Sequence, residues 1–214
     1  MASGRRFRKY CVGSGILDFA CAELTPIPGL SLMPIETEKK YRLTKAQREQ
    51  VRQRLSELGA ERKKEEFEEN TIYIGPGLAA GNNVLRLRRV GASATLTYKH
   101  RLPGPSSIKH QLEEETGVAN PDAMTAILEA TGFKAALVYE KRRETWTFAA
   151  TEIVIDELPF GLFMEIEGRP CEIEAVECKL RISDLDPELA TYPQLTLQQG
   201  KPSGSVIEAR FKKD

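Results

Sequence analysis

The sequence predicts an α+β protein in which helices flank an antiparallel β-sheet. Six or more segments alternate apolar and polar side chains, as strands with one buried face do. Short turns join several of these segments, for example GAS at 91–93 and PFG at 159–161, so neighbouring strands are expected to form hairpins. Other segments carry helix-start residues ahead of apolar residues at helical spacing, which predicts helices packed on the sheet.

The predicted strands follow one another closely along the chain. They lie at 35–43, 62–74, 85–90, 94–102, 109–116 and 138–148, with two more inside 152–168 around the turn. The second and third strands are separated by a glycine-rich loop, GPGLAAGNN at 75–83. Helices are predicted at 44–58, 120–131 and 173–182, and the segment 186–195 is a short helix or a turn. Thr44 with Gln47 forms a capping box, and Asn120 with Pro121 marks the second helix start.

Composition excludes some classes of function. The 31 basic and 31 acidic residues give a formal net charge of zero, without the global basic field of a non-specific nucleic-acid binder. The four cysteines contain no CxxC pair, which argues against a zinc site or a disulfide framework and favours a reducing compartment. No apolar run is long enough to span a membrane. We therefore expect a cytoplasmic protein that binds neither nucleic acid nor a membrane.

The ends of the chain differ in composition from the middle. Residues 1–33 combine a basic start with a loosely apolar stretch interrupted by Asp18, and they end in a Pro-rich linker. We expect a disordered extension or a start codon assigned too early, with a signal peptide as the alternative. The organised domain is predicted at 34–195, and the polar, Gly- and Pro-containing segment 196–214 is expected to be a flexible tail.

The first strand carries an unusual set of charges on one face. Because side chains alternate along a strand, Glu36, Glu38, Lys40 and Arg42 share a face. Magnesium takes one or two carboxylates and completes its shell with water and phosphate oxygens. A basic group beside the carboxylates could then hold the phosphate. A solvent-facing strand with alternating charges gives the same pattern, so the interpretation depends on the other strands.

Other strands repeat the arrangement in pairs of one sign. The cationic pairs are Arg86 with Arg88, Lys99 with Arg101 and Lys141 with Arg143, and the acidic pairs are Glu36 with Glu38, Glu113 with Glu115 and Glu165 with Glu167. An open antiparallel sheet with a polar outer face explains the alternation without any function. If the sheet instead curls into a barrel with this face inside, acidic and basic walls face each other. Such a lumen needs partners for its charges, and a polyphosphate with Mg2+ or Mn2+ supplies them.

In order and spacing, these residues resemble the CYTH superfamily, the triphosphate tunnel metalloenzymes. The resemblance covers about 34–195 and rests on ExExK, RxR, a following strand lysine, KxR, an Asp and a closing ExE. These motifs are Glu36, Glu38 and Lys40, then Arg86 and Arg88, Lys99, Lys141 and Arg143, Asp156, and Glu165 and Glu167. The superfamily includes class IV adenylyl cyclases, thiamine triphosphatases and inorganic triphosphatases. The resemblance implies an eight-stranded antiparallel β tunnel, closed like a barrel and flanked by helices.

The resemblance also implies roles for single residues. Metal ligands would be Glu36, Glu38, Asp156, Glu165 and Glu167, of which Glu36, Glu38 and Asp156 would be catalytic. Phosphate ligands would be Lys40, Arg86, Arg88, Lys99, Lys141 and Arg143, and further tunnel residues would be Arg101, Lys109, Glu113 and Glu115. One departure is Gln111, where many cyclase-like members carry an arginine. His100 and His110 match no motif and are interpreted as ordinary strand residues.

The resemblance implies an enzyme that depends on Mg2+ or Mn2+ and acts on a small-molecule triphosphate. The favoured activity is that of a class IV adenylyl cyclase, which converts ATP to cyclic AMP and pyrophosphate. One alternative is a triphosphatase that hydrolyses tripolyphosphate or thiamine triphosphate. A non-catalytic polyphosphate-binding module and a purely structural β domain stay open as well. A homodimer is compatible with the resemblance.

Overall fold

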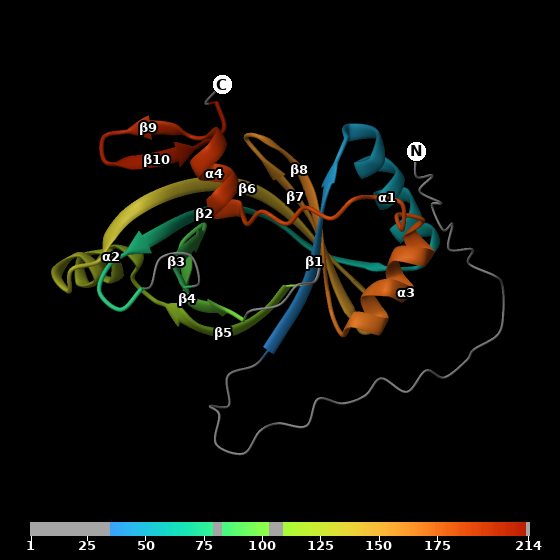
Figure 1. The fold of residues 1–214 in the computed structure, drawn as a ribbon, viewed down its shortest axis with the longest axis horizontal. Coiled ribbons are helices and arrows are strands. Elements are labelled where there is room, and N and C mark those ends of the chain that lie inside the picture. The colour runs from blue at the N-terminus through green and yellow to red at the C-terminus, as the bar shows by residue number, and fades with distance from the viewer. Residues whose placement is uncertain (1–34, 79–82, 103–108, 213–214) are drawn as a thin grey trace, which may run out of the picture.

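The computed structural model describes residues 35–78, 83–102 and 109–212. Eight of the described strands form a barrel (Figure 1). They are β1 (Ile35–Leu43), β2 (Glu61–Ile74), β3 (Asn83–Val90), β4 (Ser93–Arg101), β5 (Lys109–Val118), β6 (Lys134–Phe148), β7 (Thr151–Leu158) and β8 (Gly161–Glu167). The extension predicted at 1–33 lies outside the described residues.

Pairing between β2 and β6 closes the barrel. The strand order is β2-β3-β4-β5-β1-β8-β7-β6, and every neighbouring pair in it is antiparallel. The two longest strands, β2 and β6, then pair along their whole length, from Glu61 opposite Thr147 to Ile74 opposite Lys134. This closed eight-stranded antiparallel barrel with flanking helices confirms the predicted fold class.

Apolar residues on the outer face of the barrel hold the helices. The helices are α1 (Lys45–Glu57), α2 (Pro121–Ala130), α3 (Pro170–Leu180) and α4 (Tyr192–Gln199). Helices α1 and α3 lie together on one side of the barrel, and α2 covers the opposite end (Figure 1). Val51 of α1 and Ile173 of α3 share a buried core with Met164 of β8, while Leu128 of α2 packs in a core with Leu87 of β3.

The predicted helix starts at Thr44 and Asn120 are confirmed. The Thr44 and Gln47 side chains bond each other's backbone N–H groups, and the Asn120 side chain accepts from the backbone N–H of Ala123. Within 186–195, where a short helix or a turn was expected, a helix begins after its cap residue Thr191. No described helix is both long enough and apolar enough to span a membrane.

Regular structure continues past residue 195, where a flexible tail was expected. Helix α4 runs to Gln199, and β9 (Lys201–Ser203) and β10 (Val206–Ala209) form a hairpin. Strand β10 pairs in parallel with β6 at 137–139. Strand β7 pairs with the same strand only from Arg142 onward, so β10 supplies the hydrogen-bond partners that β7 does not. The hairpin's polar composition gives no apolar alternation from which its strands could be predicted.

The two leucines of α4 offer a direct test of how this helix docks. Leu195 is 3% exposed in the core beneath α4, whereas Leu197 is 55% exposed. We expect Leu195→Ala to lower the free energy of unfolding by about 2–4 kcal/mol, because the truncation leaves a buried cavity. Leu197→Ala is the matched control and is expected to change it by less than about 0.5 kcal/mol. Urea denaturation measures both, and equal values would contradict the docked position of α4.

Candidate functional site

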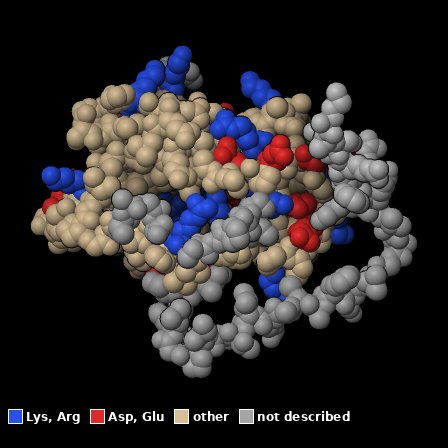
Figure 2. All heavy atoms as spheres, in the orientation of Figure 1, with Lys and Arg blue, Asp and Glu red and all other residues tan. Residues whose placement is uncertain are grey.

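The interior of the barrel forms a cavity of about 510 Å3. Figure 2 shows a hollow near the middle of one face, with Lys and Arg atoms inside it and acidic atoms beside it. The structure brings fourteen of the fifteen predicted site residues to this cavity. They are Glu36, Glu38, Lys40, Arg86, Arg88, Lys99, Arg101, Lys109, Glu113, Glu115, Lys141, Arg143, Glu165 and Glu167. The exception is Asp156, which is buried behind the wall.

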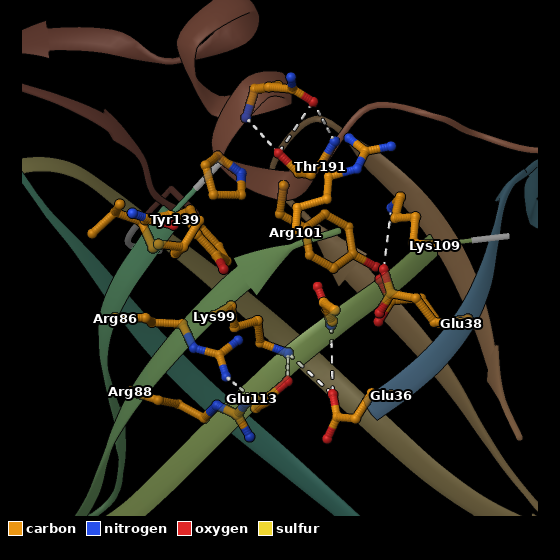
Figure 3. Close-up of a pocket in the computed structure, with 18 of the residues that line it drawn as sticks. Glu36, Glu38, Arg86, Arg88, Lys99, Arg101, Lys109, Glu113, Tyr139 and Thr191 are labelled. Atoms are coloured by element: carbon orange, nitrogen blue, oxygen red, sulfur yellow. Dashed lines mark hydrogen bonds and ion pairs between the residues drawn. The ribbon is translucent and has the colours of Figure 1, made fainter. Parts of the chain in front are cut away.

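Arginines of β3 form one wall of the cavity. Arg86 and Arg88 point inward because they alternate with Leu87, which packs beneath α2 (Figure 3). The Nη2 of Arg86 donates to Thr97 at 3.2 Å and to Glu115 at 3.3 Å. The Nε atoms of Arg86 and Arg88 are buried and donate no hydrogen bond within the described part of the chain. Buried donors without an acceptor are suited to an anionic ligand.

Carboxylates of β1 and β5 face this wall and share its cations. Lys99 forms ion pairs with Glu113 and, at 3.5 Å, with Glu36 (Figure 3). Burial, together with a hydrogen bond between the two carboxyl groups, raises the pKa of Glu113. Gln111, at the position of the missing arginine, donates from Nε2 to Glu36 Oε2 at 3.5 Å. The glutamine therefore holds a predicted metal ligand, and Lys109 and Lys141 are the cations at the cavity that could replace the missing arginine.

Three carboxylates lie side by side on neighbouring strands. Glu167 of β8 stands opposite Glu38 of β1 and opposite Glu152 of β7, and all three line the cavity. Burial raises the pKa of Glu167 to about 7, and the negative charges of Glu152 and Glu38 add to this shift. Carboxylate oxygens are the donors that hard divalent cations prefer, so the chemistry of these residues suits such an ion.

The carboxylates are held by cations rather than gathered around one point. Among the described residues, no three His, Cys, Asp or Glu side chains lie arranged to hold a metal ion. Glu38 accepts from Lys109 at 3.1 Å, and Glu165 pairs with Lys40 at 3.2 Å and with Arg143 at 2.9 Å. A metal ion would therefore have to replace lysine and arginine partners at these carboxylates.

A buried layer lies behind the cationic wall of β6. The ammonium of Lys141 sits between Glu68 at 3.3 Å and Asp156 at 3.4 Å, and all three side chains are at most 1% exposed. Arg143 donates to both oxygens of Asp156, at 2.7 and 2.6 Å. Burial and the neighbouring charge of Arg143 lower the pKa of Lys141 to about 8, against the opposing effect of the carboxylates. These bonds fix two phosphate-ligand candidates on one strand.

Tyr192 of α4 contacts both this buried layer and strand β1. Its hydroxyl donates to Asp156 at 2.8 Å, and its ring lies 3.8 Å from the Nζ of Lys40. Lys40 also donates to the backbone oxygen of Ala190 at 3.3 Å. The oxygens of Asp156 are thus occupied by Arg143, Lys141 and Tyr192, and its predicted roles in metal binding and catalysis stay predictions.

The polarity of the interior changes along three neighbouring strands. On β2 the inward side chains pass from Glu68 through Asn70 to Ile72, and on β6 they pass from Lys141 to Tyr139. On β3 the charged residues give way to an apolar side chain at the end of the strand. The apolar end is completed by α4 and the loop after β2. Its apolar lining residues are Ile72, Ile74, Leu78, Val84, Pro193 and Leu197.

Some residues of the site were not predicted from the sequence. Glu68, Glu152 and Tyr192 were not among the predicted residues, and the partners that place them in the site lie on other strands. The sequence signals for Glu68 are Glu66 two residues before it and Asn70 two residues after it, at strand spacing on β2. His100 and His110 do not line the cavity and bond Asn83 and Thr37, respectively.

Comparison with known proteins decides the family. The CYTH domain model matches residues 34–196, which is most of the chain. The chain belongs to the CYTH family. No curated protein matches it at the level of sequence.

Solved structures of CYTH-like shape support the fold of this CYTH chain. The PH1819 protein of Pyrococcus horikoshii is 26% identical, with a TM-score of 0.63 over 77% of this chain and 99% of its own. A candidate adenylate cyclase of Vibrio parahaemolyticus is 20% identical, with a TM-score of 0.60 over 76% and 98%. The candidate adenylyl cyclase HpAC1 of Hippeastrum, described as having a dominant triphosphatase activity, is also 20% identical, with a TM-score of 0.60 over 79% and 98%.

Adjacent arginines of β3 allow a test of anion binding in the cavity. Arg88 points inward, whereas Arg89 points outward and pairs with Asp122. Imidotriphosphate, an analogue that resists hydrolysis, given with Mg2+ at about 100 times its Kd should stabilise the protein by about 2.7 kcal/mol. Arg88→Gln should remove about 1.5–2 kcal/mol of this stabilisation, because a charge-assisted hydrogen bond is lost.

Arg89→Gln is the control for this experiment. It removes the same charge from the same strand on the outer face, so ligand stabilisation should be kept. Thermal denaturation with and without the ligand measures each value. If both variants respond alike, the cationic wall of β3 does not bind the triphosphate.

Proposed function

We propose that this chain is a metal-dependent enzyme that breaks a phosphoanhydride bond of an organic triphosphate. The observation that carries this proposal is the closed barrel, in which paired cations face paired carboxylates across an enclosed cavity. Enclosed charges are costly unless they meet opposite charges, so the arrangement is suited to a ligand that offers both signs. A triphosphate with divalent cations does so.

The balance of charge supports the need for a metal. In the described structure, eight Lys and Arg and seven Glu side chains line the cavity, and Glu68 and Asp156 lie buried behind it. The walls therefore hold no surplus of positive charge. The negative charge of a bound triphosphate would not be balanced unless metal cations were bound with it. Mg2+ or Mn2+ would be held by Glu36, Glu38, Glu165 and Glu167. When bound, the ion would neutralise phosphate charge and polarise the reacting phosphorus centre.

The side chains of this chain would orient the triphosphate. Arg86, Arg88 and Lys99 approach from β3 and β4, while Lys141 and Arg143 approach from β6. Positioning and electrostatic stabilisation supply most of the catalysis in phosphoryl transfer, so fixed cations on several strands suit this chemistry. We assign Asp156 to holding Lys141 and Arg143 in place, since these cations occupy its oxygens.

The apolar end of the cavity favours an organic triphosphate over bare tripolyphosphate. An inorganic chain of phosphates has no apolar part, whereas a nucleoside or thiamine group would cover Ile72, Val84 and Leu197. Asn83 and Gln194 line the same region and can hydrogen-bond a heterocycle. This region supports the cyclase candidate, because cyclisation needs a nucleoside held beside the phosphates.

The second candidate reaction is hydrolysis of the triphosphate by water. The description of HpAC1 as a protein with dominant triphosphatase activity supports this candidate. In cyclisation the 3′ hydroxyl of ATP attacks the α-phosphorus and pyrophosphate leaves. In hydrolysis water attacks the γ-phosphorus, the diphosphate leaves, and the γ-phosphoryl group is released as orthophosphate. The cationic wall serves both reactions, so the product distinguishes them.

A product assay tests the proposed function. Purified protein with Mg2+ or Mn2+ is given ATP, thiamine triphosphate and tripolyphosphate in separate reactions. Cyclic AMP with pyrophosphate identifies a cyclase, and orthophosphate identifies a triphosphatase. We expect Glu36→Gln to lower kcat by at least about 100-fold, because it removes a metal-binding charge beside the phosphates.

Glu129→Gln, an exposed change on α2, should leave the rate unchanged. The chelator EDTA should abolish product formation, and added Mg2+ should restore it. Tight binding of all three compounds without any product would instead identify a non-catalytic polyphosphate-binding module.

The role of the apolar end can be tested at Leu197. Leu197→Ala should raise KM for ATP and thiamine triphosphate by about five- to tenfold, because it removes apolar contact with the organic group. KM for tripolyphosphate should stay unchanged. Leu189→Ala is the matched control, since Leu189 is 56% exposed and does not line the cavity. An equal rise of KM for all three substrates would contradict an organic-group site at this end.

A further inference from the structure

Glu68 is a buried carboxylate surrounded by cations of the cavity wall. It is 1% exposed and does not line the cavity itself. Its oxygens lie 3.3 Å from Lys141 Nζ, 3.7 Å from Arg88 Nε and 3.8 Å from Arg143 Nε. The three cations come from strands on both sides of β2. No other described carboxylate pairs with cations of both β3 and β6.

The barrel closure places Glu68 at this point. On β2 it stands directly opposite Lys141 of β6, in the pairing of β2 with β6 that closes the barrel. The amide of Asn70, on the same face, donates to Glu68 at 3.2 Å and holds the carboxylate in place. The surrounding cations, with Lys141 and Arg143 foremost, keep the pKa of Glu68 below its usual range against the effect of burial. The carboxylate is therefore charged and fixed.

We propose that Glu68 is a positioning residue that holds Lys141, Arg143 and Arg88 together behind the bound triphosphate. The inference rests on the proposed function and adds a residue to it. Without the carboxylate, three neighbouring cations would repel one another at short range, and each would move away from the others. Glu68 acts through these cations and does not touch the substrate.

Whether the affinity for triphosphate rises or falls when the charge of Glu68 is removed distinguishes a positioning role from a purely structural one. Removing a negative charge behind the wall makes the wall more positive, so a triphosphate should bind at least as tightly as before. The cations would no longer be held in the reactive arrangement, and displacements of about 1 Å cost on the order of 100-fold in rate. Loss of structure alone would weaken binding and turnover together.

The test compares the kinetics of Glu68→Gln with those of the wild-type protein. We expect kcat to fall by about 100-fold for the best triphosphate substrate, while calorimetry shows imidotriphosphate with Mg2+ binding no more weakly than to wild type. Glu68→Asp keeps the charge but moves it one methylene further from the cations, so its kcat should lie between the two, about three- to tenfold below wild type. A wild-type kcat in Glu68→Gln, or a joint loss of kcat and affinity, would overturn the inference.

Glu144→Gln is the matched control. Like Glu68, Glu144 is buried, but it lies on β6 and pairs with Arg52 and Arg62 outside the cavity. Its substitution should lower stability but leave kcat and affinity unchanged.

If Glu68→Gln does not fold, Glu68→Asp decides: reduced kcat with retained affinity supports the inference, and an unchanged kcat overturns it. Wild-type protein that turns over no triphosphate would overturn the proposed function, and this inference with it. Wild-type turnover together with a fully active Glu68 variant would overturn the inference alone.

Discussion

The structure depends on one constraint: charges enclosed by a closed barrel must meet opposite charges. The pairing of β2 with β6 closes the barrel, so the inward faces of all eight strands surround one interior. Ion pairs between residues on neighbouring strands satisfy this constraint. Opposite charges stand directly across from each other at Glu68 and Lys141, Lys99 and Glu113, Glu38 and Lys109, Lys40 and Glu165, and Arg143 and Asp156. At these positions, residues that form same-sign pairs along a strand meet opposite charges on the neighbouring strand, whereas Glu167 faces the carboxylates Glu38 and Glu152.

This arrangement gives the walls two layers with different consequences. In the inner layer, residues such as Lys99 and Glu36 are partly exposed, and in the proposed function they would exchange each other for phosphate and metal. In the outer layer, Asp156 and Glu68 are almost fully buried and keep their partners. Breaking a buried pair is costly, whereas exchanging a half-exposed partner is cheap. The barrel therefore combines an exchangeable surface with fixed supports, which is the preorganisation that electrostatic catalysis needs.

Much of the fold could be predicted because strand alternation is a local property. The first strand was predicted at its observed bounds, and the inward faces of β3, β4 and β6 follow from the spacing of their Arg and Lys residues. The family resemblance supplied the closure of the barrel. The support by Glu68 could not be predicted, since its partner Lys141 is far away in sequence and the pairing register is set by tertiary structure. The hairpin of β9 and β10 was not predicted for a related reason, because β10 pairs with β6, which is far away in sequence.

The two sides of the cavity differ in their lining, and this difference would orient a bound substrate. Carboxylates of β1, β7 and β8 gather on one side of the cavity, while apolar residues come from the ends of β2 and β3 and from α4. A molecule with a phosphate chain at one end and a heterocycle at the other matches both sides in one orientation only. Tripolyphosphate has identical ends and cannot use this difference. The asymmetry of the walls is therefore the structural argument for the proposal that the substrate is an organic triphosphate.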